Sequence, residues 1–236
     1  GLQPTELIII AGRPSMGKTA LALNIGHYAA KKTKKGVVVF SLEMSNLQLG
    51  MRMLGFDAQI DLRDLRRGSL RDKDWPNLTE AASHLSELPI FIDDTSGISV
   101  LEMKARCRRL IKKYDLALVI VDYLQLISGR SSSESRQQEI SEISRSLKGL
   151  AKDLNVPVVA VSQLNRRVED RPKKKPELAD LRESGAIEQD ADVIVFIYKD
   201  DSQSDMEGEG YDNVVKVDVA KQRNGPTGPI KLTFQK

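Results

Sequence analysis

One segment, Gly12-Arg13-Pro14-Ser15-Met16-Gly17-Lys18-Thr19, sets the architecture of this chain, because it follows an apolar run and leads into a helical pattern. It matches G-x-x-x-x-G-K-[ST], a phosphate-binding loop. Its glycines let successive N–H groups point inward, and the following helix N-terminus adds partial positive charge. We therefore expect this loop to bind a nucleoside triphosphate through Gly12, Arg13, Pro14, Ser15, Met16, Gly17, Lys18, Thr19 and the adjacent Ala20. A chance match in a turn is the alternative, and the flanking strand and helix argue against it.

Four side chains, two of them in this loop, make up the expected hydrolytic site. Lys18 would reach the β- and γ-phosphates, and the Thr19 hydroxyl would hold Mg²⁺. Asp122 ends the apolar run Ala117–Asp122 and is the expected magnesium carboxylate, unless it only caps the next segment. Glu43 follows the strand Val37–Ser41 and is our candidate for the base that accepts the proton of the attacking water, with an ordinary surface glutamate as the alternative.

Short β-branched runs alternate with helical patterns, which predicts an α/β fold with a mainly parallel central sheet. Because the runs are apolar nearly throughout, we expect helices on both faces of the sheet. The predicted parallel strands are Leu7–Ala11, Val37–Ser41, Pro89–Ile92, Ala117–Asp122, Val156–Ser162 and Val193–Tyr198. Two alternating segments, Val214–Ala220 and Pro229–Phe234, predict a C-terminal antiparallel hairpin at the sheet edge.

Helices are predicted at Lys18–Lys31, Asn46–Phe56, a broken region Leu62–Leu88, Val100–Tyr114 and about Arg136–Leu154. Three segments show neither the helical nor the strand period and are expected to be irregular, namely Ser128–Ser135, Asn165–Pro176 and Lys199–Asn213. A length of 236 residues suits one α/β core, so we predict a single domain over residues 1–236.

Composition narrows the class of protein. With 36 basic and 33 acidic residues, charge alone does not indicate nucleic acid. The single cysteine, Cys107, cannot form an internal disulfide, and no apolar run approaches a membrane span. We therefore expect a cytoplasmic protein. Since the chain starts at Gly1 close to its first strand, we also expect a fragment of a longer protein that lacks an N-terminal region.

Taken in order, Gly12–Thr19, Ser41–Met44 and the Asp122 strand make the chain similar to the RecA-like P-loop ATPases. Three later motifs narrow the resemblance: SQLNR at Ser162–Arg166, DLRESGAIEQDAD at Asp180–Asp192 and AKQRNG at Ala220–Gly225. Together they resemble the C-terminal motor domain of bacterial or phage replicative helicases of the DnaB type, over nearly the whole chain.

The resemblance implies an ATP- and Mg²⁺-dependent DNA helicase motor that translocates on single-stranded DNA, 5′ to 3′, as a homo-hexameric ring. It implies Glu43 as catalytic base, and Gln163 as a sensor of the γ-phosphate that signals to an adjacent DNA loop. Lys221 and Arg223 match a pair that reaches into the neighbouring subunit's ATP site. The positions that match contacts to the DNA backbone are Arg166, Arg182, Glu183 and Gly185. Primase and a helicase loader are implied partners of the full-length protein.

Physical reasoning agrees with several of these roles. A motor that accepts any sequence should grip phosphates, which suits Arg182 and the main chain at Gly185, whereas the Glu183 carboxylate can only orient basic groups. Lys221 and Arg223 lie two residues apart at a strand end and should project from one face. The alternatives are a local ion pair for Arg182-Glu183, and solvated surface charges for Lys221, Arg223 and the basic segment Arg166–Lys175.

Two other functions remain open at this point. A recombinase or recombination mediator shares the same core but need not unwind duplex DNA. A nucleotide-gated DNA-binding or loading module would use ATP only as a switch, and the presence of Glu43 argues against it. A second basic cluster, on the predicted helix Val100–Tyr114, is interpreted as the wet face of an amphipathic helix, with Cys107 in the core.

Overall fold

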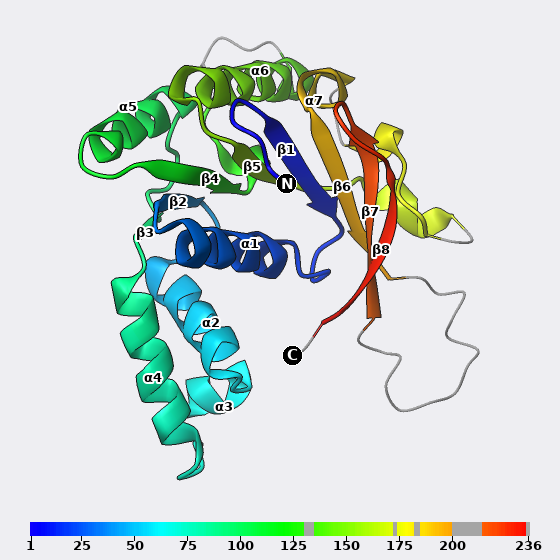
Figure 1. Ribbon diagram of the computed structural model, residues 1–236. Helices are drawn as coiled ribbons and strands as arrows, with labels where there is room; N and C mark the ends of the chain where they lie inside the picture. Colours follow the sequence, from blue (N-terminus) through cyan, green and yellow to red (C-terminus); the bar gives the residue numbers. More distant parts are fainter. Residues whose placement is uncertain (130–134, 172–173, 182–184, 200–213, 235–236) are drawn as a thin grey trace.

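The computed structural model describes residues 1–129, 135–171, 174–181, 185–199 and 214–234. Its central feature is one eight-stranded sheet with the strand order β3-β2-β4-β5-β1-β6-β7-β8. The strands from β3 to β6 are parallel, and β7 and β8 are antiparallel additions at one edge (Figure 1). This confirms the predicted RecA-like arrangement of a mainly parallel sheet with a C-terminal hairpin.

Each predicted strand is present within a few residues of its expected bounds. The parallel strands are β1 (Leu7–Gly12), β2 (Gly36–Ser41), β3 (Ile90–Asp93), β4 (Leu116–Asp122), β5 (Val158–Gln163) and β6 (Val193–Tyr198). The hairpin comprises β7 (Val214–Gln222) and β8 (Gly228–Thr233). β7 therefore continues two residues beyond the predicted end and includes Lys221.

Helices cover the sheet on both sides, as the apolar strands require. Alternate residues of β1 enter two separate cores: Leu7 and Ile9 pack with α6 (Arg136–Leu154), and Ile8 and Ile10 pack with α1 (Lys18–Thr33). The first core also contains α5 (Val100–Ile111) and α7 (Gly185–Asp190), and the second contains α2 (Asn46–Ala58). A sheet buried on both faces fixes the ends of its strands rigidly, and the site is built on those ends.

Local signals explain where several helices begin. α2 and α5 each start with a capping box, in which Ser45 pairs with Gln48 and Ser99 with Glu102. The broken region resolves into α3 (Leu62–Arg67) and α4 (Asp74–Glu87), separated by Gly68, whose φ of 68° suits glycine. With α2, these two helices form the arm that extends below the sheet in Figure 1.

The sequence patterns missed four short elements, namely η1 (Leu124–Leu126), η2 (Arg166–Asp170), η3 (Leu178–Asp180) and α7. All are six residues or shorter, too short to show a helical period. The structure thus corrects the expectation that Asn165–Pro176 is wholly irregular, because η2 lies within it. Most of the segment Lys199–Asn213 and of Ser128–Ser135 lies outside the described residues.

Tertiary packing also brings together residues that are distant in sequence. His27 of α1 and His84 of α4 both approach the carboxylate of Asp57 on α2, at 3.4 and 3.7 Å. Burial lowers the pKa of His27, and the nearby Asp57 carboxylate partly opposes that shift. Within the described ranges, no group of three or more His, Cys, Asp or Glu side chains could hold a metal ion.

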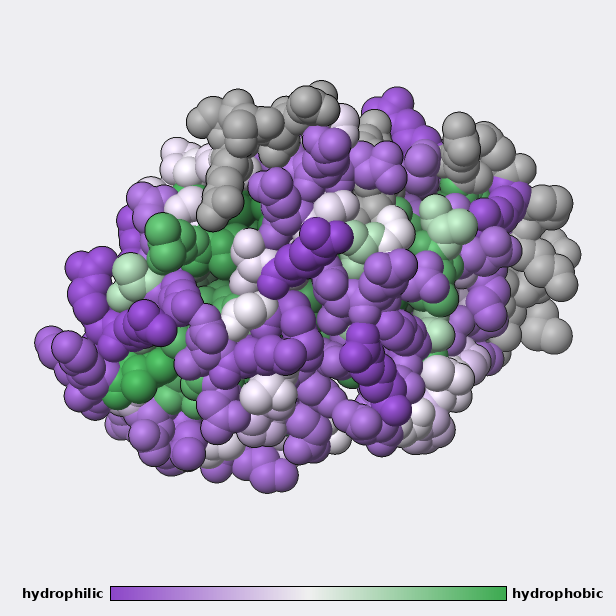
Figure 2. Space-filling model, turned by 90° about the horizontal axis from the view of Figure 1, so that it is seen from above, coloured by the Kyte–Doolittle hydropathy of each residue, from purple (hydrophilic) through white to green (hydrophobic). Residues whose placement is uncertain are grey.

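The face formed by α5, α6 and α7 is largely hydrophilic, with smaller hydrophobic areas between the polar side chains (Figure 2). On α5, Arg108 and Arg109 are exposed while Met103 and Cys107 are fully buried, as predicted for an amphipathic helix. Burial raises the pKa of Cys107 to about 12, which makes it an unreactive core residue. None of the helices in the described parts of the chain is long and apolar enough to cross a bilayer.

Candidate functional site

The carboxyl ends of four parallel strands meet at one cavity of about 300 Å³. Sheet register explains the meeting, because Gly12 of β1 lies beside Gln163 of β5, and Ser41 of β2 lies beside Asp122 of β4. The cavity is lined by Pro14, Ser15, Gly17, Lys18, Thr19, Ala20, Glu43, Met44, Arg52, Asp122, Tyr123 and Gln163. The structure therefore gathers the predicted metal and base residues and most of the predicted nucleotide residues around one space, while Gly12, Arg13 and Met16 do not line it.

The phosphate loop requires glycine at two positions for different reasons. Gly17 has a φ of 86°, and a side chain there would also meet the ring of Phe234 at 2.9 Å. Gly12 is confined by strand packing, because a Cβ atom would lie 2.7 Å from the backbone carbonyl of Ile197. The two glycines let the loop curl at the start of α1 while β1 stays close to β6.

Lys18, Thr19 and Asp122 form the polar centre of the cavity. The Thr19 hydroxyl donates to Asp122 Oδ2 at 2.7 Å, and Lys18 Nζ donates to the Arg13 carbonyl at 2.8 Å. Burial lowers the pKa of Lys18 against the opposing effect of Asp122, and burial raises the pKa of Asp122 against the Thr19 hydrogen bond. A hydroxyl and a buried carboxylate in contact are the hard oxygen donors that suit Mg²⁺, so the site fits the predicted metal.

Glu43 lies at the rim of this cavity, where its carboxylate is exposed on the turn between β2 and α2. This position gives it access to solvent, as a base for an attacking water needs. Arg52 of α2 lines the same cavity and was not identified from the sequence. Its Nε is buried without a hydrogen-bond partner, and its charge lowers the pKa of Asp122. The only sequence signal that could have suggested a role for Arg52 is its place on α2, next to Met53 and three residues after Leu49, which are both buried.

Gln163 ends β5 and borders the cavity, as expected for a group that contacts a bound triphosphate. The amide of Gln125, in η1, donates to the Ser162 hydroxyl at 3.0 Å and to the Gln163 carbonyl at 3.3 Å. It also accepts from the Gln163 backbone N–H at 3.4 Å. Gln125 thereby fixes the main chain from which the Gln163 side chain extends, and the sequence alone did not reveal this contact.

The Arg13 side chain is directed away from the cavity. Its guanidinium donates to the Leu164 carbonyl at 3.1 Å and forms an ion pair with Glu169 of η2 at 2.7 Å. Arg13 is accordingly not among the residues that line the cavity. We therefore expect Arg13 to contact the nucleotide through its main chain only. Its side chain joins the phosphate loop to the segment after β5.

Two of the predicted DNA-contacting positions, Arg166 and Gly185, are among the described residues, and their segments lie side by side. Arg166 is exposed in η2, and Gly185 is the exposed first residue of α7. Leu164 and Leu181 form an antiparallel bridge that ties the two segments together. Arg182 and Glu183 lie outside the described residues.

Two cations of the basic segment are neutralised within the chain. Arg171 pairs with Asp180 and with Glu177, the latter at 3.4 Å, and Lys175 pairs with Asp218 at 3.3 Å. The segment therefore offers fewer charges to an external phosphate than its composition indicates. Arg166 is exposed in η2, and it is the cation of this segment that we expect to act on DNA.

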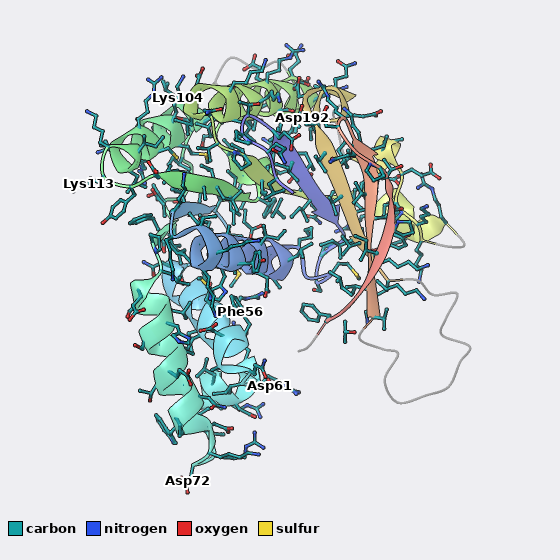
Figure 3. The ribbon with its side chains drawn as sticks, in the orientation of Figure 1. Phe56, Asp61, Asp72, Lys104, Lys113 and Asp192 are labelled. Carbon is teal, nitrogen blue, oxygen red and sulfur yellow. The ribbon has the colours of Figure 1, made fainter. Side chains whose placement is uncertain are left out.

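Lys221 and Arg223, which the resemblance places in a neighbouring subunit's ATP site, both reach α7 of their own chain. Lys221 Nζ donates to the Ala191 carbonyl at 2.7 Å, and the Arg223 guanidinium donates to the Gln189 carbonyl, both at the C-terminal end of α7. Burial lowers the pKa of Lys221, with a further contribution from Arg223. Asp192, which is labelled in Figure 3, supports this corner. It binds Lys148 and the Leu7 N–H, and it lies near Arg223. In this single chain the pair caps its own α7.

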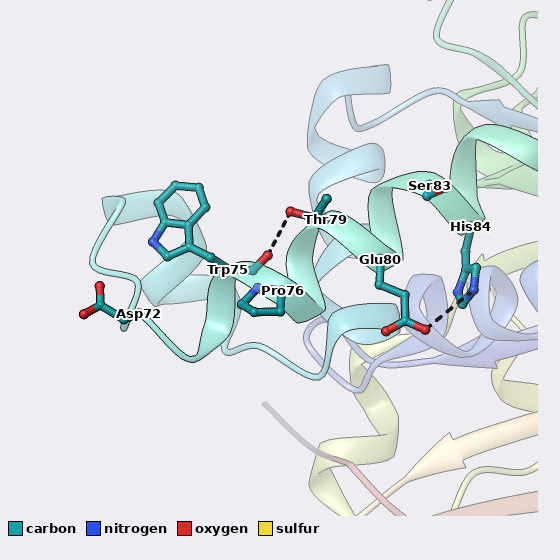
Figure 4. A pocket seen from close by; sticks show the side chains of 7 residues that line it. All are labelled: Asp72, Trp75, Pro76, Thr79, Glu80, Ser83 and His84. Atoms are coloured by element: carbon teal, nitrogen blue, oxygen red, sulfur yellow. Dashed lines mark hydrogen bonds and ion pairs between the residues drawn. The ribbon is translucent and has the colours of Figure 1, made fainter.

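A larger hollow of about 710 Å³ lies on α4 (Figure 4). It is lined by Asp72, Trp75, Pro76, Thr79, Glu80, Ser83 and His84, and Trp75 is more than half exposed. None of the predicted catalytic, nucleotide or DNA residues borders it. We therefore assign the functional site to the smaller cavity at the strand ends.

Comparison with known proteins shows which family the chain resembles along its whole length. The family described as "DnaB-like helicase C terminal domain" matches residues 1–236. The chain is 52% identical to the replicative DNA helicase DnaB of Geobacillus stearothermophilus and to the replicative DNA helicase DnaC of Bacillus subtilis, covering all of this chain and 52% of each relative. A solved DnaB-like replicative helicase, studied with its primase interactions, aligns with a TM-score of 0.93 and 40% identity over all of this chain and 57% of its own. The chain thus spans about half the length of the curated relatives it matches.

Proposed function

This chain belongs to the DnaB-like helicase C-terminal domain family, and from that premise we propose that it is the ATP-hydrolysing motor domain of a replicative DNA helicase. One observation carries the proposal: Lys18, Thr19, Glu43, Asp122 and Gln163 converge from separate elements on a single cavity. A motor requires that hydrolytic groups and a sensor of the phosphates share one site, and this cavity provides both.

In the proposed reaction, the loop N–H groups and Lys18 bind and orient the triphosphate of ATP. Thr19 and Asp122 would hold Mg²⁺, which would neutralise charge on the phosphates. Glu43 accepts the proton of the attacking water, and it is more exposed than Lys18, Thr19 and Asp122. Arg52 adds a fixed positive charge near Asp122 and helps to keep that carboxylate ionised.

We further propose that ATP lies between neighbouring subunits of a six-membered ring. Lys221 and Arg223 would then leave the carbonyls of their own α7 and enter the next subunit's site. A head-to-tail contact of this kind closes into a ring when its rotation permits. An arginine supplied by another subunit typically raises the hydrolysis rate by about 10³–10⁵, so turnover would depend on assembly.

Single-stranded DNA is the proposed track, held through phosphates by Arg166, Arg182 and the main chain at Gly185, with Glu183 orienting the basic groups. The placement of Arg166 three residues after Gln163 supports a link between the γ-phosphate and the DNA grip. The proposed direction of travel, 5′ to 3′, follows the family. Primase and a helicase loader are proposed partners of the full-length protein.

The test is steady-state ATP hydrolysis with and without unstructured single-stranded DNA, over a range of protein concentrations at low salt. We expect the specific activity to rise with both DNA and protein concentration. A rate indifferent to both would mean that the site is complete within one subunit and would contradict the motor. Strand displacement on a forked duplex is the second measurement, because a recombinase-type ATPase with the same core would fail it.

A further inference from the structure

Arg13 occupies an unusual position for a phosphate-loop residue, because it contacts the nucleotide site and the expected DNA segment at the same time. Its carbonyl accepts a hydrogen bond from Lys18 Nζ at 2.8 Å inside the loop. Its guanidinium leaves the loop and reaches the Leu164 carbonyl and the Glu169 carboxylate at 3.1 and 2.7 Å. One residue therefore joins the lysine that binds phosphate to the segment that follows Gln163.

The contacts continue from there toward the second predicted DNA segment. Leu164 bridges to Leu181, and the Asn165 N–H donates to the Asp180 carbonyl at 3.0 Å. Leu181 directly precedes Arg182 in the sequence. A displacement of Leu164 would consequently be felt both at Arg166 in η2 and at the chain leading to Arg182.

The energetics of the ion pair favour a transmitting role over a stabilising one. The Glu169 side chain is 54% exposed, and an ion pair with one exposed partner contributes little to folding stability. The Arg13 side chain is only 15% exposed, so its position is defined by packing. The contact is therefore able to break and re-form without unfolding the domain.

We propose that Arg13 is a positioning residue that couples phosphate binding to the grip on single-stranded DNA, through its ion pair with Glu169 and its hydrogen bond to Leu164. A triphosphate draws Lys18 from the Arg13 carbonyl, the loop adjusts at Arg13, and the guanidinium shifts Leu164 and η2. This coupling rests on the proposed function, and it is additional to the contact expected from Gln163, because it acts through the Arg13 guanidinium and Glu169 and not through the Gln163 side chain.

The experiment measures the dissociation constant of a fluorescein-labelled oligo(dT) by anisotropy, with and without a non-hydrolysable ATP analogue and Mg²⁺. The ratio of the two constants is the coupling between the sites, typically about 5- to 150-fold where sites are linked. We expect Glu169→Gln to reduce this ratio by about two- to fivefold, the range of an exposed ion pair. Its analogue affinity and its DNA-free hydrolysis should stay at the wild-type level, since Glu169 does not line the cavity.

Glu177→Gln is the matched control, because Glu177 is another exposed carboxylate of the same segment but pairs with Arg171 instead. Its ratio should equal that of the wild type. In a double-mutant cycle, Arg13→Gln combined with Glu169→Gln should lose no more coupling than Arg13→Gln alone.

Three results would overturn the inference. They are a wild-type ratio in Glu169→Gln, a loss in Glu177→Gln as large as that in Glu169→Gln, and additive losses in the double-mutant cycle. A wild-type ratio of one is a separate outcome, since it would refute linkage altogether and count against the proposed motor. A coupled wild type with an unaffected Glu169→Gln variant would refute Arg13 alone.

Discussion

The Thr19 hydroxyl donates a 2.7 Å hydrogen bond to Asp122 Oδ2, which joins the first turn of α1 to the end of β4. Asp122 is 3% exposed, so this carboxylate is held by the fold before any ligand arrives. Preformed oxygen donors cost little reorganisation when a cation binds, and their removal should weaken metal binding more than folding.

The first prediction concerns these two donors. Asp122→Asn should weaken the Mg²⁺-dependent part of ATP affinity by about 10- to 100-fold, because the amide removes the negative charge while keeping the shape. The measurement is a titration of fluorescent ATP analogue at several Mg²⁺ concentrations. Thr19→Ser keeps the hydroxyl and should bind as the wild type does, whereas Thr19→Val should not. Unchanged Mg²⁺ dependence in Asp122→Asn would remove it from the metal site.

Replacing Glu43 by glutamine tests the proposed base. Turnover should fall by about 10²–10⁴, because the amide cannot accept a proton, while ATP affinity should stay close to that of the wild type. Steady-state hydrolysis and equilibrium nucleotide binding separate the two effects. Glu87→Gln, an exposed carboxylate on α4, is the control and should leave both unchanged. Normal turnover in Glu43→Gln would exclude it as the base.

Mixing two inactive variants tests whether Arg223 acts on the neighbouring subunit. Arg223→Ala keeps its own nucleotide site, and Glu43→Gln keeps its Arg223, so some interfaces of a mixed ring are complete. In a random equal mixture about a quarter of head-to-tail interfaces should pair the intact halves. Hydrolysis by the mixture should therefore exceed that of either variant alone. Activity no greater than the mean of the two would show that Arg223 does not act in trans.

Salt dependence tests the contact of Arg166 with DNA. If its guanidinium neutralises a phosphate, Arg166→Ala should reduce the slope of log affinity against log salt by about 0.7 per subunit engaged, the value for a single-stranded phosphate. Anisotropy of labelled oligo(dT) between low and moderate salt measures the slope. Arg108→Ala on the exposed face of α5 should leave it unchanged. Equal slopes in the wild type and Arg166→Ala would assign Arg166 to the solvated surface.

Acid should destabilise the arm through His27. Its pKa in the folded chain lies below the ordinary 6.5, mainly because of burial, so the unfolded chain binds more protons as the pH falls below about that value. The free energy of unfolding should therefore decrease from pH 7 toward pH 5. Asp57, Lys31 and His84 face the imidazole, and Asp57 partly offsets the effect.

Urea unfolding at several pH values measures this dependence. His27→Gln cannot titrate, and its unfolding free energy should vary less over the same range, with His84→Gln as the control for a more exposed imidazole. An identical pH profile in His27→Gln and the wild type would contradict the assignment.

The sequence by itself determined the sheet, its hairpin and the chemistry of the phosphate loop. Apolar runs and the loop Gly12–Thr19 are local patterns, and a buried strand or a glycine-dependent turn leaves its mark on neighbouring residues. Asp122 and Glu43 could also be identified from the sequence, because Asp122 ends a recognisable strand and Glu43 follows one. The expected meeting of these groups followed from parallel strands sharing one carboxyl edge.

Tertiary structure alone decided which side chains touch across that edge. The direction of the Arg13 guanidinium toward Glu169, the Gln125 contacts with β5 and the place of Arg52 in the cavity depend on register and packing between distant segments. The approach of His27 and His84 to Asp57 has the same origin. Such contacts arise only when the strands are ordered and the helices docked, since no periodicity along the chain encodes which distant partner a charged side chain will meet.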